Sequence, residues 1–281
     1  MAIRFIVDSA ADILPVEAEE MGICVLPMKV IFGSEEFLDG VTLNHADFYH
    51  RLKTSDTLPT TCQVPPADWA DACEKITANG DTAIIITISS GFSGTYQSAC
   101  IAAEDFDGKV YVVDSQNVTA GERLLVQRGL ELAKQGLSAA QIVSILDEEK
   151  LHIRLFALLD TLENLKKGGR ISSTTALAGT LLSIKPLISV CDGKINMAGK
   201  ARGAKQGAKL LWELIEKEGA DFTKPFCLAY TGSSNERVLA FAADNAGHFP
   251  CAVADLPIAS VGSTIGTHAG SDAYAVAFFT K

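Results

Sequence analysis

TAIIITISSGFSGTYQSA, residues 82–99, begins as an apolar β-branched run, continues through a loop of glycine and serine, and ends with helical spacing. A short apolar run of this kind is typical of a strand that is buried on both faces. A strand that leads directly into a helix is half of a βαβ unit. This stretch therefore predicts an α/β protein with a mainly parallel sheet.

The flanking sequence repeats the same alternation. Further apolar β-rich runs predict strands at 3–7, 23–32 and 109–113, and helical spacing predicts helices at 66–78 and 95–106. Because parallel strands need crossover connections, these helices are expected to cover both faces of the sheet.

The second half of the chain has a different pattern. After two predicted helices, 119–134 and 138–150, a strand is expected at 153–159, and Asp192-Gly193 lies between two apolar runs as in a tight hairpin. A long helix is predicted at 203–217. We therefore predict two domains, an N-terminal mainly parallel α/β/α domain at 1–150 and a C-terminal mixed α/β domain at 151–281.

Composition limits the function. The 24 Lys and Arg against 34 Asp and Glu give a net charge of −10, which disfavours nucleic acids and anionic membrane surfaces as partners. No run approaches 18 apolar residues, and the N-terminus lacks the apolar segment of a signal peptide. Seven scattered cysteines without a Cys-x-x-Cys pair indicate reduced thiols. We expect a cytoplasmic protein with no integral membrane segment.

The glycine and serine loop at 88–95 is a candidate anion site. Backbone N–H groups at the start of a helix lack intrahelical partners, Ser93 adds a hydroxyl, and Gly94 permits close approach of the backbone. Alternatively, Ser93 or Thr95 simply caps the helix. The spacing matches neither a Walker loop nor a dinucleotide fingerprint, and the nucleophile elbow of hydrolases would need glycine at Thr95.

Three other segments hold candidate ligand-binding residues. LPTTCQVPP at 58–66 places Thr60, Thr61 and Cys62 in a proline-bounded loop, which is either functional or an ordinary turn. Arg170 precedes a nearly apolar stretch within 161–188 that either packs in the core or lines a cavity beside small residues at 176, 178 and 179.

His268 lies between glycines in GTHAG, which would let its ring project toward a ligand, although a lone histidine is more often structural. The five histidines show neither HExxH nor a Cys/His cluster, so no metal site is expected.

These segments together resemble the DegV family over essentially the whole chain. The resemblance rests on VDSAAD at 7–12, PTTCQ at 59–63, ISSGFSGTYQSA at 88–99, VDSQNVTAG at 113–121, LENLKKGGRIS at 162–172, LLSIKPLI at 181–188, the Lys200/Arg202 turn and VGSTIGTHAG at 261–270. They follow one another in the order of that family.

The resemblance implies a fatty-acid-binding subunit with a two-domain fold and its lipid site between the domains. One long-chain fatty acid, such as palmitate, stearate or oleate, would lie in a buried tunnel. Its carboxylate would contact Thr61 and Ser93. A partner fatty acid kinase would receive this carboxylate and form an acyl phosphate for phospholipid synthesis.

Further residues follow from the same resemblance. Thr60, Cys62 and Gly94 would contribute to the site, and Arg170, Arg202 and His268 would complete its polar end or face the kinase. No cofactor and no catalysis by this chain itself are implied.

Two departures from the family pattern concern acyl selectivity and kinase pairing. Cys62 stands where a serine is usual, and Ser271-Asp272 replaces a frequent Pro-Gly. Two other functions remain open from the residues: a Ser/His hydrolase using Ser93 and His268, oriented by Asp8 or Asp114, and a regulatory protein that binds a non-lipid ligand.

Overall fold

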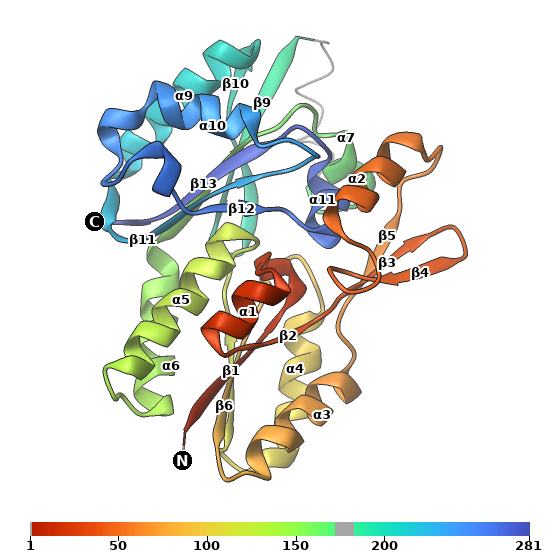
Figure 1. Ribbon diagram of the computed structural model, residues 1–281, viewed down its shortest axis with the longest axis vertical. Coiled ribbons are helices and arrows are strands. Elements are labelled where there is room, and N and C mark those ends of the chain that lie inside the picture. Colours follow the sequence, from red (N-terminus) through yellow and green to blue (C-terminus); the bar gives the residue numbers. More distant parts are fainter. Residues whose placement is uncertain (1, 172–182) are drawn as a thin grey trace.

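The computed structural model describes residues 2–171 and 183–281 (Figure 1). The three small residues expected to leave space beside the apolar stretch, Ala176, Ala178 and Gly179, lie outside the described residues.

A four-stranded parallel sheet forms the first half, with strand order β2-β1-β6-β7. Its strands are β1 (Ile3–Asp8), β2 (Cys24–Leu26), β6 (Thr82–Thr87) and β7 (Val110–Asp114). The apolar run that predicted this sheet occupies a central strand, and Ile84, Ile85 and Ile86 are fully buried in β6. The predicted parallel α/β arrangement is confirmed.

Helices cover both faces of this sheet (Figure 1). One pair is α3 (Pro66–Thr77) and α4 (Thr95–Ala103), and the other is α5 (Ala120–Lys134) and α6 (Ala139–Glu149). The short helices η1 (Ser9–Ala11) and α1 (Pro15–Met21) connect β1 to β2, η2 (Glu104–Phe106) continues α4, and η3 (Lys150–His152) leads to the second sheet.

A six-stranded mixed sheet forms the second half, in the order β10-β9-β8-β13-β11-β12. Its strands are β8 (Ile153–Leu158), β9 (Ile184–Cys191), β10 (Lys194–Arg202), β11 (Ala220–Tyr230), β12 (Ile258–Ser260) and β13 (Tyr274–Thr280), and only the β11–β12 pair is parallel. The predicted hairpin turn is present, since Asp192 and Gly193 both have positive φ.

Alternate side chains of this second sheet face two different cores. Ala275, Ala277 and Phe279 of β13 pack with the first half of the chain, and Val276 and Phe278 pack with the other core.

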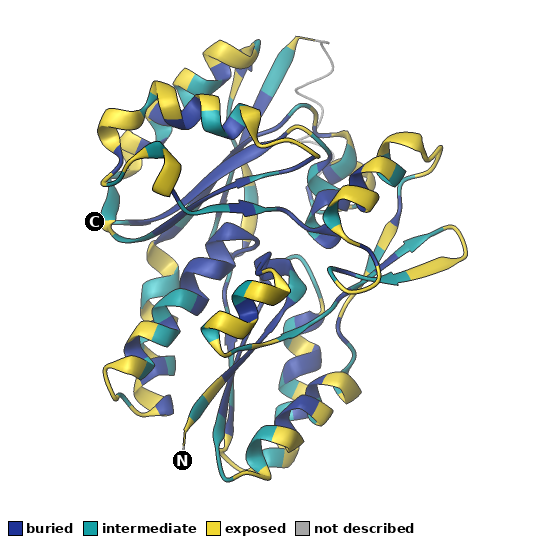
Figure 2. Ribbon diagram, in the orientation of Figure 1, coloured by how far each residue is buried: buried dark blue, intermediate teal, exposed yellow. Residues whose placement is uncertain are grey.

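That other core is covered by α9 (Ala204–Glu218) and α10 (Glu236–Asp244), with η4 (Ala246–His248) and η5 (Val253–Asp255) following. The buried strands of both sheets are visible in Figure 2. The sheet face toward the first half is the one that can border a ligand.

A third, small sheet projects beside the other two, in the order β4-β3-β5 (Figure 1). It consists of β3 (Lys29–Phe32), β4 (Glu35–Leu38) and β5 (Thr60–Cys62), and α2 (His45–Thr54) connects the last two strands. The single strand predicted at 23–32 was wrong. The chain leaves one sheet after Leu26 and enters another at Lys29, and the intervening Pro27 has no N–H for a ladder.

The segment predicted as a proline-bounded loop at 58–66 is partly a strand. Thr61 of β5 pairs with Val30 of β3, and Cys62 pairs with Lys29. A strand of three residues is too short to produce a recognisable alternation, and its hydrogen bonds come from a distant part of the sequence.

Candidate ligand-binding site

A cavity of about 410 Å³ lies between the two larger sheets. Its wall is mainly apolar and takes residues from both halves of the chain; among them are Ile88, Phe92, Leu155, Leu165, Ile188 and Ile195. This volume is within the range of about 300–1,000 Å³ that is usual for small-molecule sites.

Small side chains of the second sheet make room for the cavity. Ala229 of β11 pairs with Ala275 of β13, and Ala275 pairs with Ala157 of β8. All three alanines line the cavity. A row of methyl groups across three neighbouring strands leaves space where larger side chains would close the gap between the sheets.

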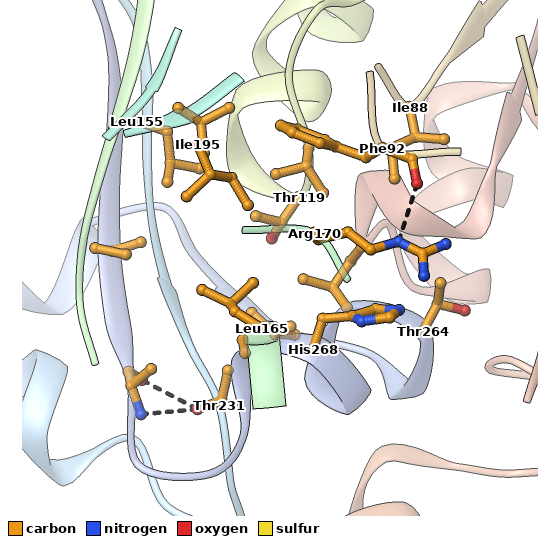
Figure 3. A pocket seen from close by; sticks show the side chains of 18 of the residues that line it. Ile88, Phe92, Thr119, Leu155, Leu165, Arg170, Ile195, Thr231, Thr264 and His268 are labelled. Atoms are coloured by element: carbon orange, nitrogen blue, oxygen red, sulfur yellow. Dashed lines mark hydrogen bonds between the residues drawn. The ribbon is translucent and has the colours of Figure 1, made fainter. Parts of the chain in front are cut away.

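Arg170, His268 and Thr264 lie together on one side of the cavity (Figure 3). The Thr61 hydroxyl lies 3.1 Å from Nε2 of His268. Ser93 hydrogen-bonds through its hydroxyl to Thr95 Oγ1 at 2.8 Å and accepts from the Thr95 N–H at 3.3 Å. The N-cap residue of α4 is Gly94, which has no side-chain cap, so neither Ser93 nor Thr95 is the N-cap; Ser93 precedes it and lines the cavity.

Arg170 is fixed beside this polar side by backbone carbonyls. Its Nε donates to the carbonyl of Phe92 at 3.1 Å, and its Nη1 donates to the carbonyl of Gly168 at 2.6 Å. Neither acceptor is charged, so the guanidinium remains a net positive charge at the cavity. An anionic ligand group is the natural counterpart.

His268 is neutral in this environment. Burial and then the positive charge of Arg170 lower the pKa of its imidazole from 6.5 to about 4. Its Nδ1 has no hydrogen-bond partner among the described residues. Gly168 permits this packing, because a Cβ there would stand 2.2 Å from Nδ1. The ring is thus held by packing and by Thr61.

The lowered pKa of His268 predicts a specific pH effect on stability. The unfolded chain protonates this residue below about pH 6.5, but the folded chain does so only near 4. The free energy of unfolding should therefore fall as the pH drops through this window, by at most about 3 kcal/mol. Urea unfolding at about pH 7 and about pH 4.5 should show a smaller fall for His268→Gln.

The unaltered protein must be compared with His268→Gln, because another buried group changes the free energy of unfolding with pH in the opposite direction. Burial raises the pKa of Asp8 from 3.8 to about 7, so the contribution of Asp8 to stability increases as the pH drops. That contribution is common to both chains and cancels in the difference. An identical pH dependence for both would contradict the assignment to His268.

Six of the eight residues expected from the sequence line the cavity: Thr61, Cys62, Ser93, Gly94, Arg170 and His268. Thr60, the first residue of β5, is exposed and does not line it. Arg202, at the end of β10, is also exposed and does not line it. His268 belongs to α11 (Ser263–Ala269) rather than to a glycine loop.

Sequence reasoning missed several parts of the wall, including Thr119, Thr231 and Thr264. The alanine row carries no local signal, since an alanine in a strand does not reveal which neighbours stand beside it. Gln63 was also missed, although its side chain lies against the start of α4, where a Cβ on Gly94 would stand 2.1 Å from Oε1. The adjacent Thr-Thr-Cys run was the only signal for it.

The geometry of a Ser/His hydrolase is not formed. His268 contacts Thr61, and Ser93 contacts Thr95. The proposed orienting carboxylates bind elsewhere: Asp8 accepts from the N–H groups of Ala10 and Ile88, and Asp114 accepts from Ser90 and Gln116. A serine nucleophile needs a histidine base within hydrogen-bond reach.

Residues 2–171 and 183–281 contain neither a clustered metal site nor a membrane-spanning helix. No group of three or more His, Cys, Asp or Glu side chains there is placed to hold a metal ion. No helix in the same part of the chain is long and apolar enough to cross a membrane.

Comparison with known proteins agrees with this architecture. A family described as "Uncharacterised protein, DegV family" matches residues 2–281. The chain belongs to the DegV family. A DegV domain-containing protein of Deinococcus radiodurans is 33% identical over 279 residues, which cover 99% of this chain and 98% of the relative.

Solved structures of DegV proteins share the fold. A DegV family protein from Thermus thermophilus, described for its fatty acid binding, has a TM-score of 0.88 and 28% identity, with complete coverage of both chains. A stearic-acid-binding protein from Eubacterium ventriosum has a TM-score of 0.83 and 26% identity, covering 100% of this chain and 99% of that one.

Proposed function

We propose that this DegV protein binds one long-chain fatty acid in the cavity and presents its carboxylate to a fatty acid kinase. The kinase would transfer the γ-phosphoryl group of ATP to a carboxylate oxygen, and the acyl phosphate would feed phospholipid synthesis. The observation that carries the proposal is one cavity with an apolar wall and, toward one side, Thr61, Ser93, Arg170 and His268.

The two parts of the cavity match the two parts of a fatty acid. Burial of the acyl chain contributes about 0.8 kcal/mol per CH₂ group. A carboxylate needs charged or hydrogen-bonding partners when it leaves water. The hydroxyls of Thr61 and Ser93 and the guanidinium of Arg170 supply such partners. The fatty acid ligands named for solved relatives are consistent with this match.

The chain acts in this proposal as a carrier rather than as a catalyst. His268 is neutral and hydrogen-bonded to Thr61, which suits a donor or acceptor that orients a carboxylate. Phosphoryl transfer needs a bound nucleotide and its metal ions, which are assigned to the partner.

Arg202 is the residue proposed to contact the kinase. It is exposed and lies outside the cavity, so its charge is available to another protein. We expect Arg202→Ala to leave fatty acid affinity unchanged and to slow acyl phosphate formation by about tenfold, as for loss of a charged contact at an interface.

The assay uses a purified fatty acid kinase, ATP and labelled oleate, with the acyl phosphate trapped by hydroxylamine as a hydroxamate. Lys209→Ala is the matched control, because Lys209 is an exposed cation on α9. Failure of the unaltered chain to support hydroxamate formation with any such kinase would reject the carrier role. Equal rates for both variants would reject the assignment of Arg202.

A further inference from the structure

The short helix α11 supplies part of the cavity wall, including two of its polar side chains. Thr264, Ile265 and His268 all line the cavity from this helix. Seven residues form fewer than two complete turns, so the helix has few hydrogen bonds of its own. Its position must depend on contacts with the rest of the chain.

Asp39 makes the densest set of these contacts. This residue follows β4 and is 3% exposed. Its Oδ1 accepts from the N–H of Ser263 at 2.8 Å and from the Ser263 hydroxyl at 2.5 Å. Its Oδ2 accepts from the N–H of Thr264 at 3.2 Å and from the Ser9 hydroxyl at 3.0 Å. One carboxylate therefore joins the end of the small sheet, the short helix η1 and the start of α11.

The remaining surroundings of α11 restrict its movement. The N–H of Gly262 donates to Asp12 at 2.7 Å, and the amide of Asn164 donates to the carbonyl of Thr267 at 3.1 Å. The middle of the helix packs closely on α2, where a Cβ on Gly266 would stand 2.6 Å from Phe48 and 2.7 Å from Tyr49. Asp12 therefore holds the N-cap residue Gly262, and Asp39 holds the first two residues of the helix, Ser263 and Thr264.

We propose that Asp39 is a positioning residue for the fatty acid carboxylate, which it affects through α11 without lining the cavity. Its three hydrogen bonds to Ser263 and Thr264 fix the start of the helix and thereby hold the His268 ring against Thr61. His268 lies five residues after Ser263, about 7.5 Å along the helix axis, so a tilt at the start displaces the ring. This role rests on the proposed binding of a fatty acid.

The first test needs no lipid. In Asp39→Asn the carbonyl oxygen can still accept from Ser263, but the amide nitrogen cannot accept from Thr264 or Ser9. We expect the helix start to loosen and the His268 ring to become hydrated. An NMR titration should then show the pKa of His268 rising from about 4 toward 6.5. A value that stays near 4 in this variant would overturn the positioning role.

The second test measures fatty acid affinity in a double-mutant cycle. Asp39→Ala should weaken oleate binding by about tenfold, within the range for residues coupled through one network. In a His268→Ala background the same change should cost less than about twofold, because the ring that Asp39 positions is already absent. Equal fold losses in both backgrounds would contradict the mechanism.

A control separates positioning from general destabilisation. Ile142 is fully buried on α6, outside the cavity lining, and Ile142→Ala removes core packing without touching α11. It should lower the melting temperature and leave oleate affinity unchanged. A tenfold loss of affinity in this control would show that stability alone explains Asp39→Ala. If Asp39→Ala does not fold, Asp39→Asn replaces it in the cycle.

The two tests distinguish failure of this inference from failure of the proposed function. If the unaltered chain binds no fatty acid, the proposed function fails, and the titration still decides whether Asp39 positions His268. If the chain binds oleate but the titration and the cycle show no coupling, only the role of Asp39 fails.

Discussion

Replacement of Ala275 by phenylalanine is expected to abolish binding of long-chain fatty acids. Ala275 is the middle member of the alanine row, between Ala229 and Ala157, and its methyl group borders the cavity. A benzyl group there occupies space that the acyl chain needs. Exclusion of about four CH₂ groups costs about 3 kcal/mol, which is more than a hundredfold in affinity.

The chain should remain folded, because the new ring fills existing space instead of displacing packed atoms. Titration with a fluorescent fatty acid measures the loss, and circular dichroism checks the fold. Ala254→Phe is the control, because this alanine is exposed in η5. Unchanged affinity in folded Ala275→Phe would mean that the acyl chain does not occupy this cavity.

The combined change Thr61→Val and Ser93→Ala should remove most of the affinity that depends on the carboxylate. Both hydroxyls line the polar side, and hydrogen bonds to a charged group contribute about 1.5–3 kcal/mol each. Loss of two therefore predicts a decrease in oleate affinity of at least about a hundredfold. Isothermal titration calorimetry with oleate measures it.

Methyl oleate provides the matched ligand for this experiment. It has the same acyl chain but carries no charge, so the double variant should bind it nearly as well as the unaltered chain does. Native occupancy by fatty acid in the double variant would defeat the assignment of Thr61 and Ser93. An equal loss for oleate and methyl oleate would indicate a damaged cavity instead of a lost carboxylate site.

Local sequence patterns predicted the parts of the fold that depend on neighbouring residues. The apolar run of β6, the loop after it and helix α4 are contiguous. One segment of sequence therefore contains the residues that determine all three elements. The same is true of the Asp192-Gly193 turn, whose two residues both need positive φ.

Features that depend on distant pairing could not be predicted in this way. The strand β5 exists because β3 supplies its hydrogen bonds, and the alanine row exists because of the register of β8, β13 and β11. The role of Asp39 likewise depends on a contact with Ser263, 224 positions away. No window of sequence contains both partners of such contacts.

The candidate site was identified largely through the order of its motifs. The resemblance grouped Thr61, Ser93, Arg170 and His268, which no single segment could relate to one another, and the structure places them around one cavity. Thr60 and Arg202 belong to the same motifs, but Thr60 at the start of β5 and Arg202 at the end of β10 are exposed and do not line the cavity.

The central claim is that a fatty acid occupies this cavity, and the most direct measurement is the ligand content of the purified protein. The protein is denatured and extracted with organic solvent, and the extract is analysed by mass spectrometry against a mock purification. We predict one long-chain fatty acid at close to one equivalent per chain, and its absence after the same treatment of Ala275→Phe. An empty extract from the unaltered chain, with no uptake of added fatty acids, would contradict the account.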